Sequence, residues 1–466
     1  FFFLMIRRPP RSTLFPYTTL FRSPPGVHHR QLAALLAAQF DQVIVVPCGP
    51  RPDKSENGSV DPIYRAAMVD MTFCGLKRVR VELFDLEAST YTPHYLLRDR
   101  FANEGEIWLA VGSDLIQGGA AGASAIQRGW QQGMRLWHEG RFVVLRRVDQ
   151  PLCEADLPPQ ARVVEASLAG SSQELRSRIF HGQPYEHLVV PRVARYIERH
   201  ALYRGVPARR DAMFRLKEQR LLVVHDERNP EAVMAAARLE NSNTPEPELV
   251  VVIGGDGTML RAIRQHWRLR APFYGVNAGH LGFLLNDDPH FEFVHEELVL
   301  HQVPLLWVET EGVDVTCREA VAFNDCWVER ATGQAAWIEV KVNGEQRLPQ
   351  LVADGALVAT AAGSTSYARA MGATPVPLNT PVLLLVGSNV LRPHSWRPAV
   401  LPLGSQIELT TLDPVKRPLQ AYVDGVSYGD VRTLRARVSN IAAAELVFAP
   451  GHDPAAKLAR IQFPEL

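Results

Sequence analysis

The periodicity of hydrophobic and polar positions along this chain changes near residue 300. Between residues 24 and 300, short apolar runs alternate with segments of helical periodicity, which predicts parallel strands joined by helices in a doubly wound α/β sheet. Beyond residue 300, short segments of alternating apolar and polar residues are separated by turn residues. This spacing predicts a β-sandwich. We therefore expect an α/β fold with a β-rich C-terminal part.

The expected domain boundaries follow from the same change of periodicity. A charged segment at about 208–219 is expected to form a helix that links two α/β parts. The predicted divisions are a first α/β domain at 24–204, a linker at 205–220, an α/β lobe at 221–299, a β-sandwich at 300–450 and a C-terminal tail at 451–466.

The first 23 residues differ from the rest of the chain. The sequence FFFLMIRRPPRSTLFPYTTLFRS does not start with Met and shows neither a helical nor a strand period. Its Arg pair follows the apolar run, whereas a secretion signal places the charge before it. We interpret residues 1–23 as a non-native segment from cloning or adapter DNA, joined to a truncated gene, and leave it out of the expected fold. A native disordered or targeting tail is the alternative.

Composition narrows the class of protein. The 466 residues are 46% hydrophobic and 21% charged, as in globular proteins. The formal net charge of +0 gives no reason to expect nucleic-acid binding. Five scattered cysteines without a CxxC pair favour a reducing compartment, and no apolar run approaches the roughly 20 residues that cross a bilayer. We expect a cytoplasmic enzyme with no membrane partner.

The most informative stretch is LVVVIGGDGTMLRAI, residues 249–263. Its four branched apolar residues, Val250 to Ile253, predict a strand that is buried on both faces. Glycines after such a strand let the backbone approach a ligand closely, and the start of the next helix offers free N–H groups to a phosphate. Asp256 in this turn is either a proton acceptor or metal-binding carboxylate, or merely a helix cap.

Further polar and glycine-rich elements follow this turn. The segment GVNAGHLGFL at 275–284 is a second glycine-rich bend after a strand. Asn324-Asp325 is interpreted either as a ribose-binding pair or as a turn, and residues 363–367 of the segment DGALVATAAGSTSY either as a ligand-binding bend or as a helix cap. In this order, and with WRPAVLP at 396–402 and VDG at 423–425, these elements resemble the NAD kinase family over residues 220–450.

This resemblance implies that ATP phosphorylates the adenosine-ribose 2′-hydroxyl of NAD to give NADP. It implies that Asp256 is the general base and that Mg²⁺, or another divalent cation, neutralises the transferred charge; the metal-binding residues stay unassigned. The implied ATP-phosphate contacts are Gly254, Gly255, Gly257 and Thr258. The implied NAD contacts are Asp256, Gly257, the adenosine-side pair Asn324 and Asp325, the ring-packing Thr365, Ser366 and Tyr367, and Asp354 at the nicotinamide end. Ala361-Ala362 departs from the family's usual Pro-Thr.

The first α/β domain carries its own candidate phosphate-binding residues. Residues 170–176, GSSQELR, place two hydroxyls and an arginine at a helix start, which suits a polyphosphate, although Ser171 and Glu174 also fit a capping box. The neighbouring His28 and His29 open the first helix and are interpreted either as phosphate contacts or as surface histidines.

With the closing VPRVARYIERHALYRG, these features resemble nicotinate-nucleotide adenylyltransferase, a member of the HxGH nucleotidyltransferase superfamily with a Rossmann-like doubly wound fold, over about residues 24–204. The resemblance implies ATP binding by His29, Lys54, Ser171, Ser172 and Arg176, with His29 also catalytic, and mononucleotide binding by Asp114 and Trp130. Gly26 stands at the place of the first HxGH histidine, His28 at that of its glycine, and Gln173 at that of a threonine. The family's first strand would fall within residues 1–23.

We therefore predict a bifunctional enzyme that makes nicotinate adenine dinucleotide in its N-terminal half and phosphorylates NAD in its C-terminal half. Its expected partners are NAD, ATP and nicotinate mononucleotide, and we expect a homo-oligomer. There is no GxxxxGK[ST] sequence, which disfavours a P-loop enzyme. Two alternatives stay open: a lipid or sugar kinase that shares the GGDG turn, and a regulator that binds NAD without catalysis.

Overall fold

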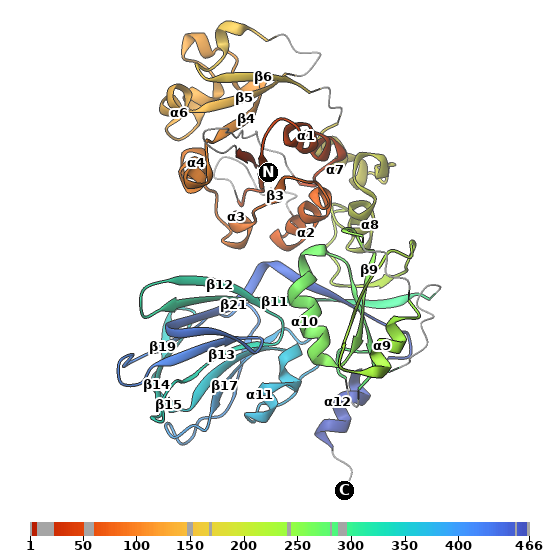
Figure 1. The fold of residues 1–466 in the computed structure, drawn as a ribbon, viewed down its shortest axis with the longest axis vertical. Coiled ribbons are helices and arrows are strands. Elements are labelled where there is room, and N and C mark those ends of the chain that lie inside the picture. Colours follow the sequence, from red (N-terminus) through yellow and green to blue (C-terminus); the bar gives the residue numbers. More distant parts are fainter. Residues whose placement is uncertain are drawn as a thin grey trace. The chain divides into compact units, whose positions relative to one another are not determined.

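The computed structural model describes residues 2–6, 23–50, 60–146, 152–166, 170–239, 244–279, 282–287, 296–452 and 454–463. It divides the chain into two compact units, Phe1–Arg209 and Arg210–Leu466. Each unit has its own sheet (Figure 1).

The N-terminal unit is built on a six-stranded sheet of order β3-β2-β1-β4-β5-β6. Its strands are β1 (Phe2–Ile6), β2 (Gln42–Val46), β3 (Val79–Val81), β4 (Trp108–Gly112), β5 (Arg141–Arg146) and β6 (Ala161–Glu165). Its helices are α1 (Val27–Ala37), α2 (Pro62–Phe73), α3 (Phe84–Glu87), α4 (His94–Phe101), α5 (Ala125–Gly129), α6 (Gly133–Glu139), α7 (Ser172–Phe180) and α8 (Pro191–Arg199). The alternation of strands and helices predicted from the sequence is therefore present.

Residues 2–6, which belong to the segment left out of the expected fold, form strand β1. It pairs with both β2 and β4, and both pairings are antiparallel, whereas β2–β3, β4–β5 and β5–β6 are parallel. An open position between β2 and β4 would leave their backbone N–H and C=O groups without ladder partners. Residues 2–6 supply those partners.

The C-terminal unit contains three parallel strands and two helices before its β-rich part. These are β8 (Leu221–His225), α9 (Pro230–Ala236), β9 (Leu249–Gly254), α10 (Asp256–His266) and β10 (Phe273–Asn277). All six residues of β9 are buried, as predicted, and Figure 1 shows α9 and α10 on opposite sides of it. The register pairs Leu221 with Leu249 and Val250 with Phe273, so the three strands end at one edge.

The β-rich part differs from the predicted separate sandwich, because its strands join those of the α/β lobe in one fifteen-stranded sheet in the described part of the unit. The joining strands are the long β11 (Leu298–Gly312) and β21 (Val426–Phe448), and β21 is also the parallel neighbour of β10. The other strands are β12 (Cys317–Ala322), β13 (Asp325–Arg330), β14 (Ala336–Val342), β15 (Glu345–Ala353), β16 (Gly355–Thr360), β17 (Val382–Ser388), β18 (Ala399–Pro402), β19 (Ile407–Thr411) and β20 (Leu419–Val423). One core, with Val308, Val328, Ile338 and Leu434 among its members, lies within this part.

Two connecting segments also differ from expectation. The segment expected as a linker helix contains β7 (Asp211–Phe214), which pairs antiparallel with β11. The expected C-terminal tail contains α12 (Pro454–Gln462). In both places tertiary contacts decide the structure, because β7 completes a sheet edge and α12 carries a buried lysine, Lys457.

Candidate functional site

The carboxyl ends of β8, β9 and β10 form one polar edge. Backbone hydrogen bonds hold this edge together, since Asp226 donates to Ile253 O and Ala278 donates to Gly254 O, both at 3.0 Å. Ligands of parallel α/β sheets bind at such an edge. The GGDG turn lies there, between β9 and α10.

The glycines of this turn serve different needs. A Cβ on Gly254 would lie 2.7 Å from the Thr258 hydroxyl oxygen, so packing within the turn excludes a side chain there. A Cβ on Gly255 or Gly257 would meet no atom within 4 Å in the described chain, and neither residue has a positive φ. Folding therefore gives no reason for glycine at these two positions, whereas a ligand approaching the start of α10 would.

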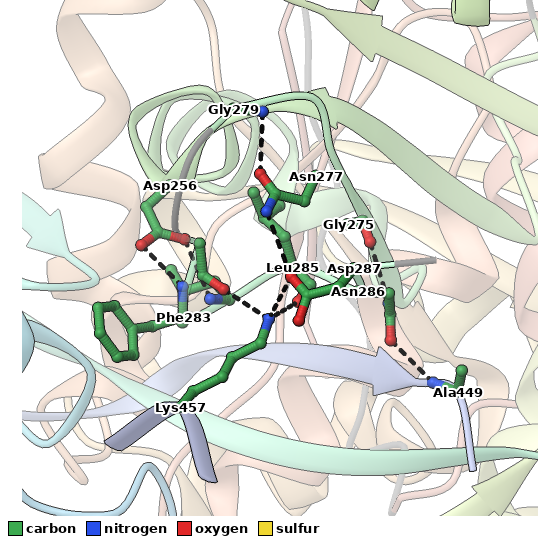
Figure 2. Close-up of polar contacts among 12 residues, drawn as sticks. Asp256, Gly275, Asn277, Gly279, Phe283, Leu285, Asn286, Asp287, Ala449 and Lys457 are labelled. Carbon is green, nitrogen blue, oxygen red and sulfur yellow. Dashed lines mark hydrogen bonds and ion pairs between the residues drawn. The ribbon is translucent and has the colours of Figure 1, made fainter. Parts of the chain in front are cut away.

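Asp256 is the first residue of α10, and its carboxylate is fixed by two backbone donors (Figure 2). The N–H groups of Phe283 and Leu284 donate to its two oxygens at 3.0 Å each. Burial raises the pKa of Asp256, while these two hydrogen bonds and the charge of Lys457 act in the opposite direction. A fixed carboxylate with a raised pKa is suited to accept a proton from a hydroxyl.

Asn324 and Asp325 are held in place by Asp424, which the sequence marks only as part of the VDG segment, without a predicted role. The Asp424 carboxylate accepts the N–H groups of Phe323, Asn324 and Asp325 at 2.8, 2.9 and 3.2 Å. Burial and the neighbouring charge of Asp424 raise the pKa of Asp325 to about 7. The buried Asn324 Oδ1 has no hydrogen-bond partner among the described residues, so it is available to a ligand donor.

The GSTSY bend contacts the Asn324 segment directly. The Thr360 hydroxyl at the end of β16 donates to Phe323 O at 2.7 Å and accepts the N–H of Gly363 at 3.2 Å. A Cβ on Gly363 would collide with the Asn324 backbone. The structure therefore brings together two elements that lie about 40 residues apart in the sequence.

The other predicted NAD contacts are distributed around this bend. Thr365 bonds back to Ala362 O at 3.3 Å, and the half-exposed Tyr367 packs on Trp327 with ring centroids 5.2 Å apart. Asp354 precedes β16, at the opposite end of that strand, where it pairs with Arg330 at 2.6 Å and Asn389 at 2.8 Å. Asp354 is therefore not part of the same cluster.

A cavity of about 430 Å³ joins the Asp256 loop to the GSTSY bend. Phe283 and Leu284, which hold Asp256, line one part of it, and Thr365 lines another. Residues of α12, including Leu458, form a further wall. Asp256, Asn324 and Tyr367 do not line the cavity themselves. Its walls include the two residues whose N–H groups bind Asp256 and a residue of the bend that contains Tyr367.

In the N-terminal unit, His29 lies buried at the start of α1. Its Nδ1 accepts the N–H of Gly26 at 2.8 Å, and its ring centroid is 3.9 Å from that of His28. Burial, and then the charge of His28, hold the pKa of His29 well below its usual range. This environment favours the neutral form of the His29 imidazole.

The predicted ATP residues of α7 reach the segment that precedes α1. Ser171 is the N-cap of α7 and accepts the N–H of Glu174 at 3.1 Å, while the Glu174 side chain pairs with Arg178 instead of closing a capping box. The Ser172 hydroxyl donates to Pro24 O at 3.0 Å and Arg176 donates to Ser23 O at 2.8 Å.

The remaining candidates of this unit lie elsewhere. Asp114 is exposed just after β4, and Trp130 stacks on His94 with centroids 3.4 Å apart. Lys54 lies outside the described residues.

Two general features of the described residues bear on ligands. They contain no group of three or more His, Cys, Asp or Glu side chains arranged to hold a metal ion. They also contain no helix with the length and hydropathy needed to cross a membrane.

Comparison with known proteins relates this site to a family. A family model described as the ATP-NAD kinase N-terminal domain matches residues 189–299. The NAD kinase of Cereibacter sphaeroides (strain ATCC 17025 / ATH 2.4.3) is 36% identical over 238 residues, which are 50% of this chain and 93% of that protein. The NAD kinase of Rickettsia bellii (strain OSU 85-389) is 35% identical over 221 residues, 47% of this chain and 86% of that protein.

Two solved structures each align with 52% of the chain. Yeast NADH kinase complexed with NADH does so at 20% identity and a TM-score of 0.42, over 79% of its own chain. An NAD kinase from Archaeoglobus fulgidus in complex with ATP does so at 22% identity and a TM-score of 0.40, over 97% of its chain. Because the chain covers most of the length of both of these NAD kinases, at 36% and 35% identity, it belongs to the NAD kinase family.

Proposed function

We propose that the C-terminal unit transfers the γ-phosphoryl group of ATP to the adenosine-ribose 2′-hydroxyl of NAD, giving NADP and ADP. The observation that carries this proposal is the Asp256 carboxylate, which two N–H groups fix beside glycines that have no packing reason to be glycine. Membership of the NAD kinase family supplies the substrates.

In this proposal Asp256 takes the proton of the 2′-hydroxyl as the oxygen attacks the γ-phosphorus. The new P–O bond forms while the bond to the β,γ-bridging oxygen breaks, and ADP leaves. The N–H groups at the start of α10, with Gly254, Gly255, Gly257 and Thr258, cradle the phosphates. Asn324 and Asp325 face the adenosine side of NAD, Thr365, Ser366 and Tyr367 pack around a ring, and Asp354 is assigned the nicotinamide end.

We expect the metal ion of this reaction to be bound largely by the phosphates of ATP. Mg²⁺ is bound by one or two carboxylates together with substrate phosphates more often than by an all-protein cage, and the described residues form no such cage. When bound, the ion neutralises charge on the phosphates of ATP.

For the N-terminal unit we propose nicotinate-nucleotide adenylyltransferase activity. The mononucleotide phosphate attacks the α-phosphorus of ATP, and pyrophosphate leaves. His29, Lys54, Ser171, Ser172 and Arg176 are assigned to ATP, and Asp114 and Trp130 to the mononucleotide. Support comes from Ser172 and Arg176, which reach the segment before α1 and so bring the α7 residues beside the α1 histidines. We also propose a homo-oligomer in the cytoplasm.

The deciding experiment assays purified protein for both products, with and without replacement of residues 1–23. Asp256→Asn should abolish NADP formation in a protein that stays folded by circular dichroism, and near-normal turnover would reject the base role. A panel of NAD, diacylglycerol, sphingosine and hexoses tests the lipid or sugar kinase alternative. Calorimetric NAD binding without product would favour the non-catalytic regulator.

A further inference from the structure

Lys457 of α12 is a buried lysine whose ammonium group is fully engaged. Its side chain is only 4% exposed. Nζ donates to the carbonyl oxygens of Gly282 and Leu285 at 2.7 Å each, and it pairs with Asp287 Oδ1 at 3.0 Å (Figure 2). An ammonium has three protons, so these three acceptors satisfy it. A buried charge persists only where it is paired in this way.

One peptide unit connects Lys457 to Asp256. The carbonyl of the Gly282–Phe283 peptide accepts from Lys457, and the N–H of the same peptide donates to Asp256 Oδ2. Because a peptide is planar and its C=O and N–H point in opposite directions, a cation at one end strengthens the donor at the other. The carbonyl of Leu285, held by the same ammonium, fixes the far side of the two donors.

The segment 282–287 is also held in place by Asn286, at a different point from Lys457. Asn286 bonds to Gly275 O through its side chain at 3.0 Å and accepts the N–H of Ala449 at 2.9 Å. This anchor joins the segment to β10 and β21 but does not contact the peptide groups that bind Asp256. Lys457, in contrast, donates to the carbonyl groups of Gly282 and Leu285, on either side of the two N–H donors.

We propose that Lys457 is a positioning residue for phosphoryl transfer, which fixes the Gly282–Leu285 loop so that its two N–H groups hold the Asp256 carboxylate in place. This inference rests on the proposed role of Asp256 as general base. In the described part of the chain, the other charged groups at this site include Asp287, which pairs with Lys457, His452, whose charge acts on Asp287, and Asp226, which lies against the glycine turn.

The charge of Lys457 also acts on the protonation of the base. Burial raises the pKa of Asp256, and Lys457 opposes that rise. Removing the ammonium should therefore raise the pKa of Asp256 further and move the acid limb of the rate profile to higher pH. Neutralising Asp287 should do the reverse, because the ammonium then loses its counter-charge. If the two substitutions acted only by loosening the loop, the acid limb of the rate profile would move in the same direction in both variants.

The test compares full-length Lys457→Met, Asp287→Asn and, as a matched control, the exposed Lys416→Met. For Lys457→Met we expect amide exchange of residues 282–285 to rise at least about tenfold, with a fall in kcat of about tenfold and little change in KM for NAD. The acid limb should move to higher pH in Lys457→Met and to lower pH in Asp287→Asn. Exchange and pH profile equal to those of Lys416→Met, or acid limbs that move to higher pH in both variants, would overturn the proposal.

A second variant covers the case in which Lys457→Met does not fold. Lys457→Gln keeps an amide donor for a carbonyl but has no charge, so it should retain part of the loop protection and still move the acid limb upward. An unmoved limb in this variant overturns the electrostatic role. Amide exchange needs no turnover, so failure of Asp256 as base, seen in Asp256→Asn, is distinguished from failure of Lys457 to hold the loop.

Discussion

The backbone N–H of Asp325 donates to the carboxylate of Asp424 at 3.2 Å, although the two side chains carry the same charge when ionised. The three N–H donors that Asp424 receives favour its ionised form, so Asp325 is the member of the pair that keeps its proton at the higher pH. The pKa of Asp325 reaches about 7 through burial and the charge of Asp424. This relationship gives the site a titration near neutral pH.

Asp325 should make the C-terminal unit less stable as the pH rises. Its folded pKa of about 7 exceeds the unfolded value of about 3.9. The stability contributed by the neutral form is therefore full below pH ~4 and is lost as the pH rises through about 7. Asp325→Asn should match wild type at pH 4 and exceed it by about 1–3 kcal/mol at pH 8, measured by urea unfolding. A difference that does not depend on pH would contradict this assignment.

Asp424→Ala should destabilise the C-terminal unit by about 2–4 kcal/mol and raise KM for NAD, because three buried N–H groups lose their acceptor. Asp430→Ala is the matched control, since Asp430 is an exposed carboxylate on the neighbouring β21. Denaturant unfolding of both variants measures the effect. Equal stability of the two would show that Asp424 does not hold the Asn324 segment.

Gly257→Ala should separate folding from function. Outside the backbone of α10 itself, no atom of the described residues lies within 4 Å of a Cβ at this position, and alanine in a helix is favoured over glycine by up to about 1 kcal/mol. We expect equal or higher stability, together with at least about a tenfold loss in kcat/KM for ATP where the methyl group meets the phosphates. Gly363→Ala should instead unfold at lower denaturant concentration, because the Asn324 backbone occupies the space. Full activity of Gly257→Ala would show that the phosphates of ATP do not bind against this turn.

Ser171→Ala should cost the N-terminal unit about 1 kcal/mol, since it removes the cap of α7. Ser171→Gly should cost only a few tenths of a kcal/mol. Thermal unfolding of the two variants checks the order. A loss as large for glycine as for alanine would argue that Ser171 acts in something other than capping.

The sequence predicts the parts of this site that depend on local pattern. The four branched residues of β9 and the glycines after them identify a buried strand, a turn and a helix within 15 residues, and the structure has all three. The partners of Asp256 and Asn324 come from elsewhere: Asp424 lies 100 residues from Asn324, and Lys457 lies 172 residues from Leu285. Periodicity carries no information about such distances.

Some signals for these residues are nevertheless present in the sequence. Asp424-Gly425 after an alternating strand is typical of a tight turn, and Asp424 has the positive φ of 46° that Asp tolerates better than most residues. Lys457 gives a weaker signal, because a lysine between Ala456 and Leu458 is not distinguishable from a surface lysine. The strand β7 was missed because charged residues near 210 suit a helix, while pairing with β11 overrides that preference.

The order in which the polypeptide emerges during synthesis matters for β21. This strand supplies the neighbour of β10 in the α/β lobe as well as partners for β19 and β20. A nascent chain that has just completed β10 therefore lacks the parallel partners of Phe273 and Tyr274, which are Leu446 and Val447. The contacts that Ala449 and Lys457 make with the segment holding Asp256 come from residues that are synthesised later still.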